Sequence, residues 1–230
     1  RRNRNRNRKT NCHMKDVDKC FDNVEKTSNN PKSSELIKTS KGLDQICSNS
    51  LDVVKCLKGY MKKCGTPIQR ELFDFGTEHF TKSTEQFCAA NGAARRTFLQ
   101  HSPCIHDKVI SQNTYRENCV NPMLATLDKT KELEVLDDRL DASCCAFTRW
   151  TECTNDLINK NCGAEAVNAM KSFVSDAIGG LSNMVCTKKA FDPNKSRCKK
   201  LYADKSAKAK GKLSDNPVTK YVASYFGFLF

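Results

Sequence analysis

Fourteen cysteines are the residues of this 230-residue chain whose number and spacing carry the most chemistry. A thiol can bind zinc, take part in redox exchange or form a structural disulfide. The sequence has no CxxC pair of the zinc-ribbon or thioredoxin kind, and an even number of cysteines at this density is typical of an oxidising compartment. We therefore predict that all of them form disulfides: Cys12, Cys20, Cys47, Cys56, Cys64, Cys88, Cys104, Cys119, Cys144, Cys145, Cys153, Cys162, Cys186 and Cys198.

Two groups of four cysteines share almost the same spacing. The steps are nine, eight and twenty-four residues in Cys47, Cys56, Cys64 and Cys88, and nine, nine and twenty-four residues in Cys144, Cys153, Cys162 and Cys186. A pattern that recurs at a fixed offset indicates duplicated structure. We expect two related six-cysteine helical units, at 12–103 and 104–198. A basic arm at 1–11 and a basic linker with an aromatic tail at 199–230 flank them.

The pairing inside each unit stays open at this level, because six cysteines allow fifteen connectivities. The ends of an antiparallel helical hairpin lie side by side, which favours two of the bonds, Cys47–Cys88 and Cys144–Cys186. Cys145 and Cys198 have no counterpart in the first unit. We predict that these two bridge the C-terminal extension to the body.

Helices are the elements that must position these cysteines. Apolar residues at three- and four-residue steps predict a helix over 43–64, ended by Gly65. Thr66, Pro67 and Gln69 then form the capping-box pattern that begins a second helix. The turn is so short that the two helices must be antiparallel neighbours. The second helix is expected to carry these residues inward: Ile68, Leu72, Phe75, His79, Phe80, Phe87 and Cys88.

The second unit repeats this arrangement, with one helix that ends at Cys162-Gly163 and a return helix after it. No sustained alternation of apolar and polar residues occurs outside the arm, so we expect no strands. The predicted fold class is all-α, a disulfide-stapled helical bundle made of two pseudo-repeated helical-hairpin units. The sequence has no run of eighteen apolar residues, and we expect no membrane-spanning helix.

The cysteine spacing resembles that of the insect twenty-seven-kilodalton hemolymph glycoprotein family, in the settings CSNSLDVVKCLKGYMKKC and CCAFTRWTECTNDLINKNC. The resemblance covers about residues 12–198 and rests on cysteine spacing and helical texture, with no catalytic motif. It implies a secreted protein that circulates in body fluid. The Arg/Asn arm and the aromatic tail depart from the pattern. The family is described as glycosylated, and this chain has one acceptor sequon, at Asn194.

Candidate metal-binding and catalytic residues are few. His101, Cys104 and His106 are of metal-ligand types, but Cys104 has a counterpart in the repeat, which favours a disulfide cysteine flanked by surface histidines. The sequence contains neither a GxSxG nor an HExxH motif. Carboxylate pairs such as Asp137 and Asp138 lie in charged helix faces. We expect a protein without enzymatic activity, metal or cofactor.

Positive charge is concentrated at the two ends of the chain. The formal net charge is +13, yet residues 11–187 carry −1, whereas residues 1–10 and 188–212 carry +6 and +8. Guanidinium and ammonium groups at this density suit phosphate, sulfate or carboxylate partners, although a solvated tail is the alternative for each end. Nucleic acid suits less well, because few aromatic residues stand among the charges. The expected contacts are Arg1, Arg2, Arg4, Arg6, Arg8, Lys9, Lys199, Lys200, Lys208, Lys210 and Lys212.

The last residues form a concentrated aromatic tail: Tyr221, Tyr225, Phe226, Phe228 and Phe230. This tail can dock on its own body, enter a groove of a neighbouring subunit or insert into a membrane surface. The hairpins also contain bulky aromatic residues that are expected to point inward: Phe73, Phe75, Phe80, Phe87, Trp150 and Phe173. These either pack the core or surround a small lipophilic molecule.

Together these patterns favour a secreted, extracellular, non-enzymatic protein. Its cationic and aromatic ends are expected to assemble with other protein subunits or to bind an acidic polymer. Two alternatives stay open, a carrier of a lipophilic small molecule and a cationic defence protein that acts on anionic surfaces. The chain begins at Arg1 with no apolar targeting segment, so we read it as the mature form of a secreted protein.

Overall fold

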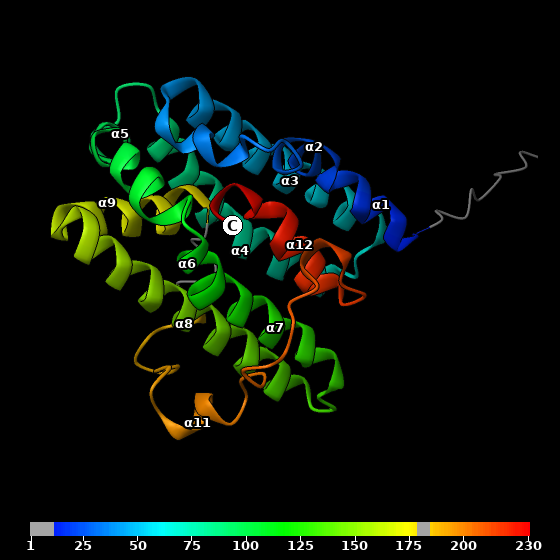
Figure 1. Cartoon of the computed structure of the whole chain (residues 1–230). Helices are drawn as coiled ribbons and strands as arrows, with labels where there is room; N and C mark the ends of the chain where they lie inside the picture. The colour runs from blue at the N-terminus through cyan, green and yellow to red at the C-terminus, as the bar shows by residue number, and fades with distance from the viewer. Residues whose placement is uncertain (1–11, 179–184) are drawn as a thin grey trace, which may run out of the picture.

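The computed structural model describes residues 12–178 and 185–230, and every regular element in these two ranges is helical (Figure 1). The predicted all-α class is confirmed. The basic arm at 1–11, with its six expected contact residues, lies outside the described residues. Within the described ranges, no helix is both long enough and apolar enough to cross a bilayer.

The α-helices are α1 (Met14–Asp18), α2 (Asp22–Ser28), α3 (Ser40–Cys64), α4 (Pro67–Cys88), α5 (Ala93–Ile105), α6 (Asn113–Tyr115), α7 (Asn121–Lys129), α8 (Leu136–Cys162), α9 (Ala164–Ser172), α11 (Ser196–Lys199) and α12 (Pro217–Tyr225). Short 3-10 or π-helical turns join them: η1 (Lys19–Phe21), η2 (Ser33–Lys38), η3 (His106–Ile110), η4 (Arg116–Val120), η5 (Thr130–Glu132), η6 (Phe173–Ile178), η7 (Gly211–Leu213) and η8 (Gly227–Leu229).

The capping box between α3 and α4 is confirmed. The Gln69 backbone N–H donates to Thr66 Oγ1 at 3.4 Å, and the Thr66 N–H donates to Gln69 Oε1 at 2.9 Å. Pro67 follows at the first helical position, where its missing N–H costs nothing. Helix α3 begins at Ser40, three residues before its predicted start, because Thr39 caps it by accepting a bond from the Gly42 N–H.

The inward face predicted for α4 is wrong over its first half. Ile68, Leu72 and Phe75 are 67%, 67% and 74% exposed, and His79 is also exposed. The second half follows the prediction, with Phe80 and Phe87 buried. Periodicity locates an apolar stripe on a helix, but it does not determine whether a neighbour covers that stripe.

All fourteen cysteines are paired, in seven disulfides. The bonds of the first group are Cys12–Cys64, Cys20–Cys56 and Cys47–Cys88. Those of the second are Cys104–Cys162, Cys119–Cys153 and Cys144–Cys186. In each group the first cysteine therefore pairs with the fifth, the second with the fourth and the third with the sixth. The two bonds favoured by hairpin geometry are present.

One hydrophobic core crosses the chain. It joins residues of α3, α5, α8 and the C-terminal η8, such as Leu43, Phe98, Trp150 and Leu229. The boundary expected between 103 and 104 falls inside α5, whose Pro103 is a helix residue. The two six-cysteine groups are thus packed against each other, and α4 lies against η6 (Figure 1).

A buried arginine, which no sequence pattern predicts, links three helices of this core by hydrogen bonds. The side chain of Arg95 on α5 is 2% exposed and donates four hydrogen bonds. Its acceptors are the Cys88 carbonyl, the Ser40 carbonyl and hydroxyl, and the Asp44 carboxylate at 2.6 Å. Because these groups belong to α3 and α4, Arg95 fixes the start of α5 on the open end of the first hairpin.

Candidate polyanion-binding surface

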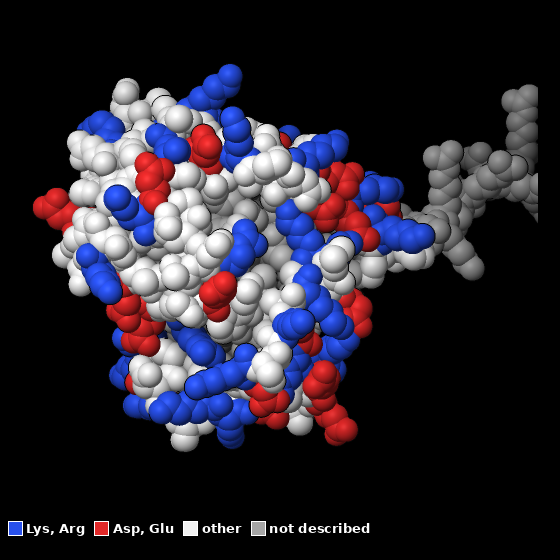
Figure 2. Space-filling model, in the orientation of Figure 1, with Lys and Arg blue, Asp and Glu red and all other residues white. Residues whose placement is uncertain are grey.

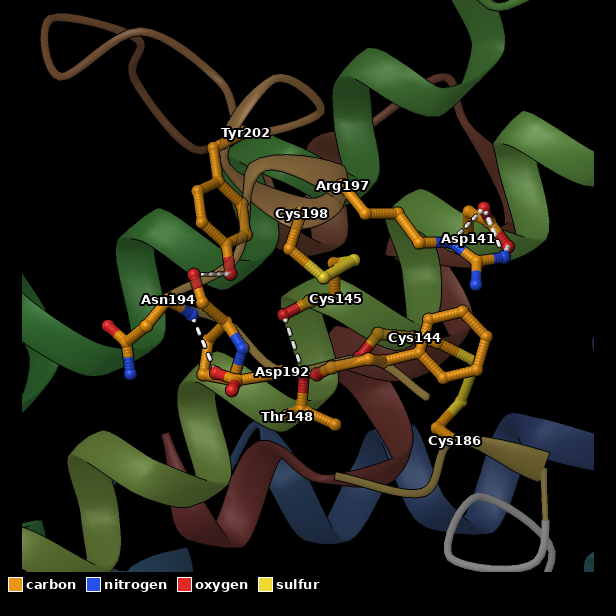
Figure 3. Close-up of a disulfide and its surroundings, with 12 residues drawn as sticks. Asp141, Cys144, Cys145, Thr148, Cys186, Asp192, Asn194, Arg197, Cys198 and Tyr202 are labelled. Carbon is orange, nitrogen blue, oxygen red and sulfur yellow. Dashed lines mark hydrogen bonds and ion pairs between the residues drawn. A yellow bond between two sulfur atoms is a disulfide. The ribbon is translucent and has the colours of Figure 1, made fainter. Parts of the chain in front are cut away.

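Two adjacent cysteines on α8 hold the basic C-terminal extension. Cys144 pairs with Cys186 and Cys145 pairs with Cys198, as predicted for both bonds (Figure 3). Consecutive residues of a helix point about 100° apart, so the two sulfur atoms reach two different segments. Segment 186–198 is therefore fastened to one short stretch of α8 at both of its ends.

Polar contacts fix the backbone of this segment between its two disulfides (Figure 3). Thr148 Oγ1 on α8 donates to the Phe191 carbonyl at 2.8 Å, and the Tyr202 hydroxyl donates to the Pro193 carbonyl at 3.1 Å. Arg197 makes two 2.8 Å hydrogen bonds to the carboxylate of Asp141, also on α8. We name segment 186–198, which two disulfides and these contacts attach to α8, the platform.

The cations on this platform and in the ten residues that follow it divide into paired and unpaired groups. Arg197 is neutralised by Asp141, and Lys188 lies 2.7 Å from Glu152. Among residues 193–208, five exposed lysines have no carboxylate within ion-pair distance: Lys195, Lys199, Lys200, Lys205 and Lys208. Figure 2 shows lysine and arginine side chains gathered over the part of the molecule that contains α11. We name these five residues the lysine surface.

Lys210 and Lys212 are corrections to the expected set of contacts. The Lys212 ammonium donates to Ser28 Oγ at 2.8 Å and to Asn29 Oδ1 at 2.9 Å, and burial lowers its pKa. Lys210 lies 3.5 Å from the Asp215 carboxylate, and its backbone N–H donates to a carboxylate oxygen of Asp128 at 3.0 Å. These two lysines attach the extension to the body, because a chain passing over the surface needs partners for its polar groups.

The aromatic tail packs on the body of its own chain, which is the first of the three positions expected for it. The Tyr221 ring stacks on Phe21 with centroids 4.6 Å apart, and the Tyr221 hydroxyl donates to Asp18 at 2.7 Å. Phe228 is buried in the core, with its ring 6.2 Å from that of Phe173. Tyr225, Phe226 and Phe230 are partly buried against the same core. The tail is an internal element, and its aromatic residues are not a free surface for assembly.

Asn194 lies on the platform, exposed to solvent. Its side-chain amide donates to Glu152 at 3.2 Å, and its backbone N–H donates to Asp192 at 2.9 Å. Figure 3 shows Asn194 beside Asp192 at the outer edge of the segment. Glycosylation of Asn194 stays a prediction, and it would cost the contact with Glu152.

The histidines around Cys104 do not form a cluster. Cys104 is bonded to Cys162, His101 lies 3.9 Å from Glu165, and the buried His106 contacts Ser34 and Asp107. His106 is a correction, since it was expected at the surface. Among residues 12–178 and 185–230, no group of three potential ligand side chains is arranged to hold a metal ion.

Buried aromatic residues such as Phe87 and Phe173 pack against one another, whereas Phe75, which was also expected to point inward, is exposed. The rings of Phe98 and Phe173 stack with centroids 4.2 Å apart, and Phe87 lies 5.6 Å from Phe173. A cleft of about 720 Å³ lies along α8 and α9, and Trp150, one of the predicted inward aromatic residues, lines it together with Met170.

No protein-family model, no curated protein and no solved structure matches this chain.

Proposed function

We propose that this chain is a secreted, non-enzymatic interaction protein that binds an acidic polymer or protein through the lysine surface. The observation that carries the proposal is the concentration of five exposed lysines without an ion-pair partner within residues 195–208. Arg197 and Lys188 are neutralised by carboxylates of α8, whereas the five lysines beside them have no such partner in the described ranges. Lys195 lies between the two disulfides, and Lys199 and Lys200 directly follow Cys198, so these ammonium groups are held close to α8. Cations held in this way favour a multivalent anion, because little order is lost when it binds.

The two-unit architecture is part of this proposal. Both cysteine groups have the same connectivity at an offset of 92 to 99 residues, which supports an ancestral helical unit that was duplicated. Seven disulfides support secretion, since such bonds persist in oxidising compartments. The resemblance to the twenty-seven-kilodalton hemolymph glycoproteins implies a secreted protein of body fluid.

Heparin chromatography of the full, oxidised chain tests the lysine surface. The variant Lys199→Glu/Lys200→Glu/Lys208→Glu should elute at clearly lower salt than the wild type. A matched control, Lys41→Glu/Lys55→Glu/Lys160→Glu, changes the net charge equally at exposed positions on α3 and α8. Its retention should fall much less, because a local cluster of charges binds a polyanion more tightly than scattered ones.

Equal losses in the two triple variants would refute the lysine surface and leave only a net-charge effect. Deletion of residues 1–10 in both backgrounds measures what the arm adds. Binding to anionic vesicles but not to heparin would favour the defence role on anionic surfaces.

A carrier of a small lipophilic molecule is a second candidate, and the cleft along α8 and α9 is the observation in its favour. Its volume lies in the range of small-molecule sites. Solvent extraction of purified protein followed by mass spectrometry tests it. Repeated preparations with no bound apolar compound would count against a carrier.

A further inference from the structure

Helix α4 can be compared residue by residue with α9 and η6. Cys64 and Cys88 flank the first with the same spacing in sequence as Cys162 and Cys186 flank the second. At this offset of 98 residues, four positions on one face of α4 correspond to four positions on α9 and η6. The pairs are Ile68 with Ala166, Leu72 with Met170, Phe75 with Phe173, and His79 with Ala177. These positions recur at steps of four, three and four, so they share one helix face.

The corresponding faces differ in exposure. Ala166, Met170, Phe173 and Ala177 are each at most 1% exposed. Ile68, Leu72 and Phe75 are about two-thirds exposed or more. We name these last three residues the α4 stripe. Exposure of three large apolar side chains on one helix face is unfavourable in free energy, and a patch of this kind is typical of an interaction site.

Helix α5 covers the face in the second unit. Its Phe98 ring stacks on Phe173 at 4.2 Å, and Cys104 near its end is bonded to Cys162, just before α9 begins. Since Cys104 is near the start of α9 and Phe98 is farther along it, α5 runs antiparallel to α9. Figure 1 shows these two helices side by side.

The equivalent bond in the first unit, Cys12–Cys64, brings the chain to the start of α4. In α5 the residues before the cysteine include the apolar Ala94, Phe98 and Leu99, which pack on the core. The eleven residues before Cys12 are RRNRNRNRKTN, with no apolar side chain among them. These eleven residues therefore contain no apolar side chain that could pack on the α4 stripe as Phe98 packs on Phe173.

Charge along the stripe indicates the character of its occupant. Glu71, Asp74 and Glu78 are exposed and lie along one edge of the stripe by helical spacing. An occupant with basic residues on the facing edge would meet complementary charge.

We propose that the α4 stripe is the docking site for a short amphipathic helix of a partner protein. This inference rests on the two-unit part of the proposed function. The partner helix lies antiparallel to α4, with its N-terminal end farthest from the Cys12–Cys64 disulfide. It places a large apolar residue on Phe75, as Phe98 lies on Phe173. Basic residues on its flank face Glu71 and Asp74. This is recognition of a helix by an apolar face with spaced anchors.

The probe is a fluorescent synthetic peptide with the sequence of α5, Ala93–Ile105, in which Cys104 is replaced by serine. Fluorescence anisotropy with the full, oxidised protein should show saturable binding. Leu72→Gln/Phe75→Gln should weaken binding at least tenfold. The control Leu136→Gln/Leu140→Gln, at two other exposed apolar positions, should leave it unchanged. A peptide with Phe98→Ala should also bind at least tenfold more weakly.

Absence of saturable binding by the wild type, or binding that ignores the Leu72/Phe75 substitutions, overturns the proposal. Self-association that disappears in Leu72→Gln/Phe75→Gln would also overturn it, in favour of a second copy of this chain. The two proposals are separable, because the stripe variant should keep its heparin retention and the lysine-surface variant should keep its peptide binding.

Discussion

Phe75 and Phe173 stand at the same position in the two cysteine frames, eleven residues after Cys64 and Cys162, yet Phe75 is 74% exposed and Phe173 is 1% exposed. Identical residue type and identical spacing thus lead to opposite environments. The difference comes from α5, which covers the second position, whereas no helix of residues 12–178 and 185–230 covers the first. Comparing the stability effects of substitutions at these two residues tests whether α5 covers Phe173 while Phe75 stays in solvent.

Phe173→Ala should lower the free energy of unfolding by about 3–5 kcal/mol, because it removes a ring from a filled core. Phe75→Ala should change it by less than about 0.5 kcal/mol, since the ring is already in water. Urea unfolding with the disulfides intact measures both. A similar loss in the two variants would show that Phe75 is buried in solution.

Arg95→Met should destabilise the fold by about 3–5 kcal/mol, because it leaves buried carbonyl groups without a donor. The adjacent Arg96 is exposed, and Arg96→Met should cost less than about 1 kcal/mol. Thermal unfolding followed by circular dichroism compares the pair. Equal melting temperatures would mean that the Arg95 hydrogen bonds contribute nothing net.

Leu229→Ala in the tail should cost about 2–5 kcal/mol, the usual cost of emptying a fully buried site. Removal of residues 226–230 should cost more and expose the core, which binding of a hydrophobic dye would report. Leu213→Ala, at a leucine that is 91% exposed, is the control. A truncated chain as stable as the wild type would contradict the internal role of the tail.

High pH should destabilise the protein through its buried phenols. Burial raises the pKa of Tyr115, and likewise that of Tyr225, to about 12. The unfolded chain has tyrosine pKa values of about 10, so the unfolded state loses these protons first. Stability is therefore fully present below pH 10 and falls as the pH rises towards 12.

Ultraviolet titration of the phenolates, together with urea unfolding at each pH, checks this expectation. Tyr115→Phe should show a shallower loss of stability above pH 10. It should be less stable at neutral pH, because the Trp150 indole N–H loses the acceptor that it has at 3.0 Å. Phenolate formation by all tyrosines near pH 10 in the folded protein would argue against the buried environment.

Cys145→Ala/Cys198→Ala should lower stability by about 3 kcal/mol. With Cys144–Cys186 intact, the ring that Cys145–Cys198 closes has about 15 residues. The length of this ring determines how much conformational entropy the disulfide removes from the unfolded chain. Salt elution from heparin should fall as well, because the lysine surface loses its fixed geometry, while the far-ultraviolet spectrum should change little. Unchanged heparin retention would show that binding needs the charges but not the platform.

Much of the fold could be predicted from local patterns. Three- and four-residue periodicity and the Thr66–Gln69 capping box depend on residues close in sequence, and they lead to the observed helices and cap. The hairpin that these helices form brings together cysteines 41 or 42 residues apart, which led to the bonds Cys47–Cys88 and Cys144–Cys186. The bridge from Cys145 to Cys198 followed from counting, because only these two cysteines had no counterpart. Arg95 has no such signal, since nothing near it in sequence identifies its acceptors on α3 and α4.

By itself, then, the sequence determined an all-helical, disulfide-linked chain with its positive charge at the ends. Only the tertiary structure decided which apolar faces are covered, that the aromatic tail lies in the core, and that Lys212 is tied to Ser28 while Lys199 and Lys200 stay exposed. The physical reason is that helix formation and capping arise within a few residues. Burial and ion pairing depend on neighbours brought from far along the chain, as α5 is brought to Phe173 but not to Phe75.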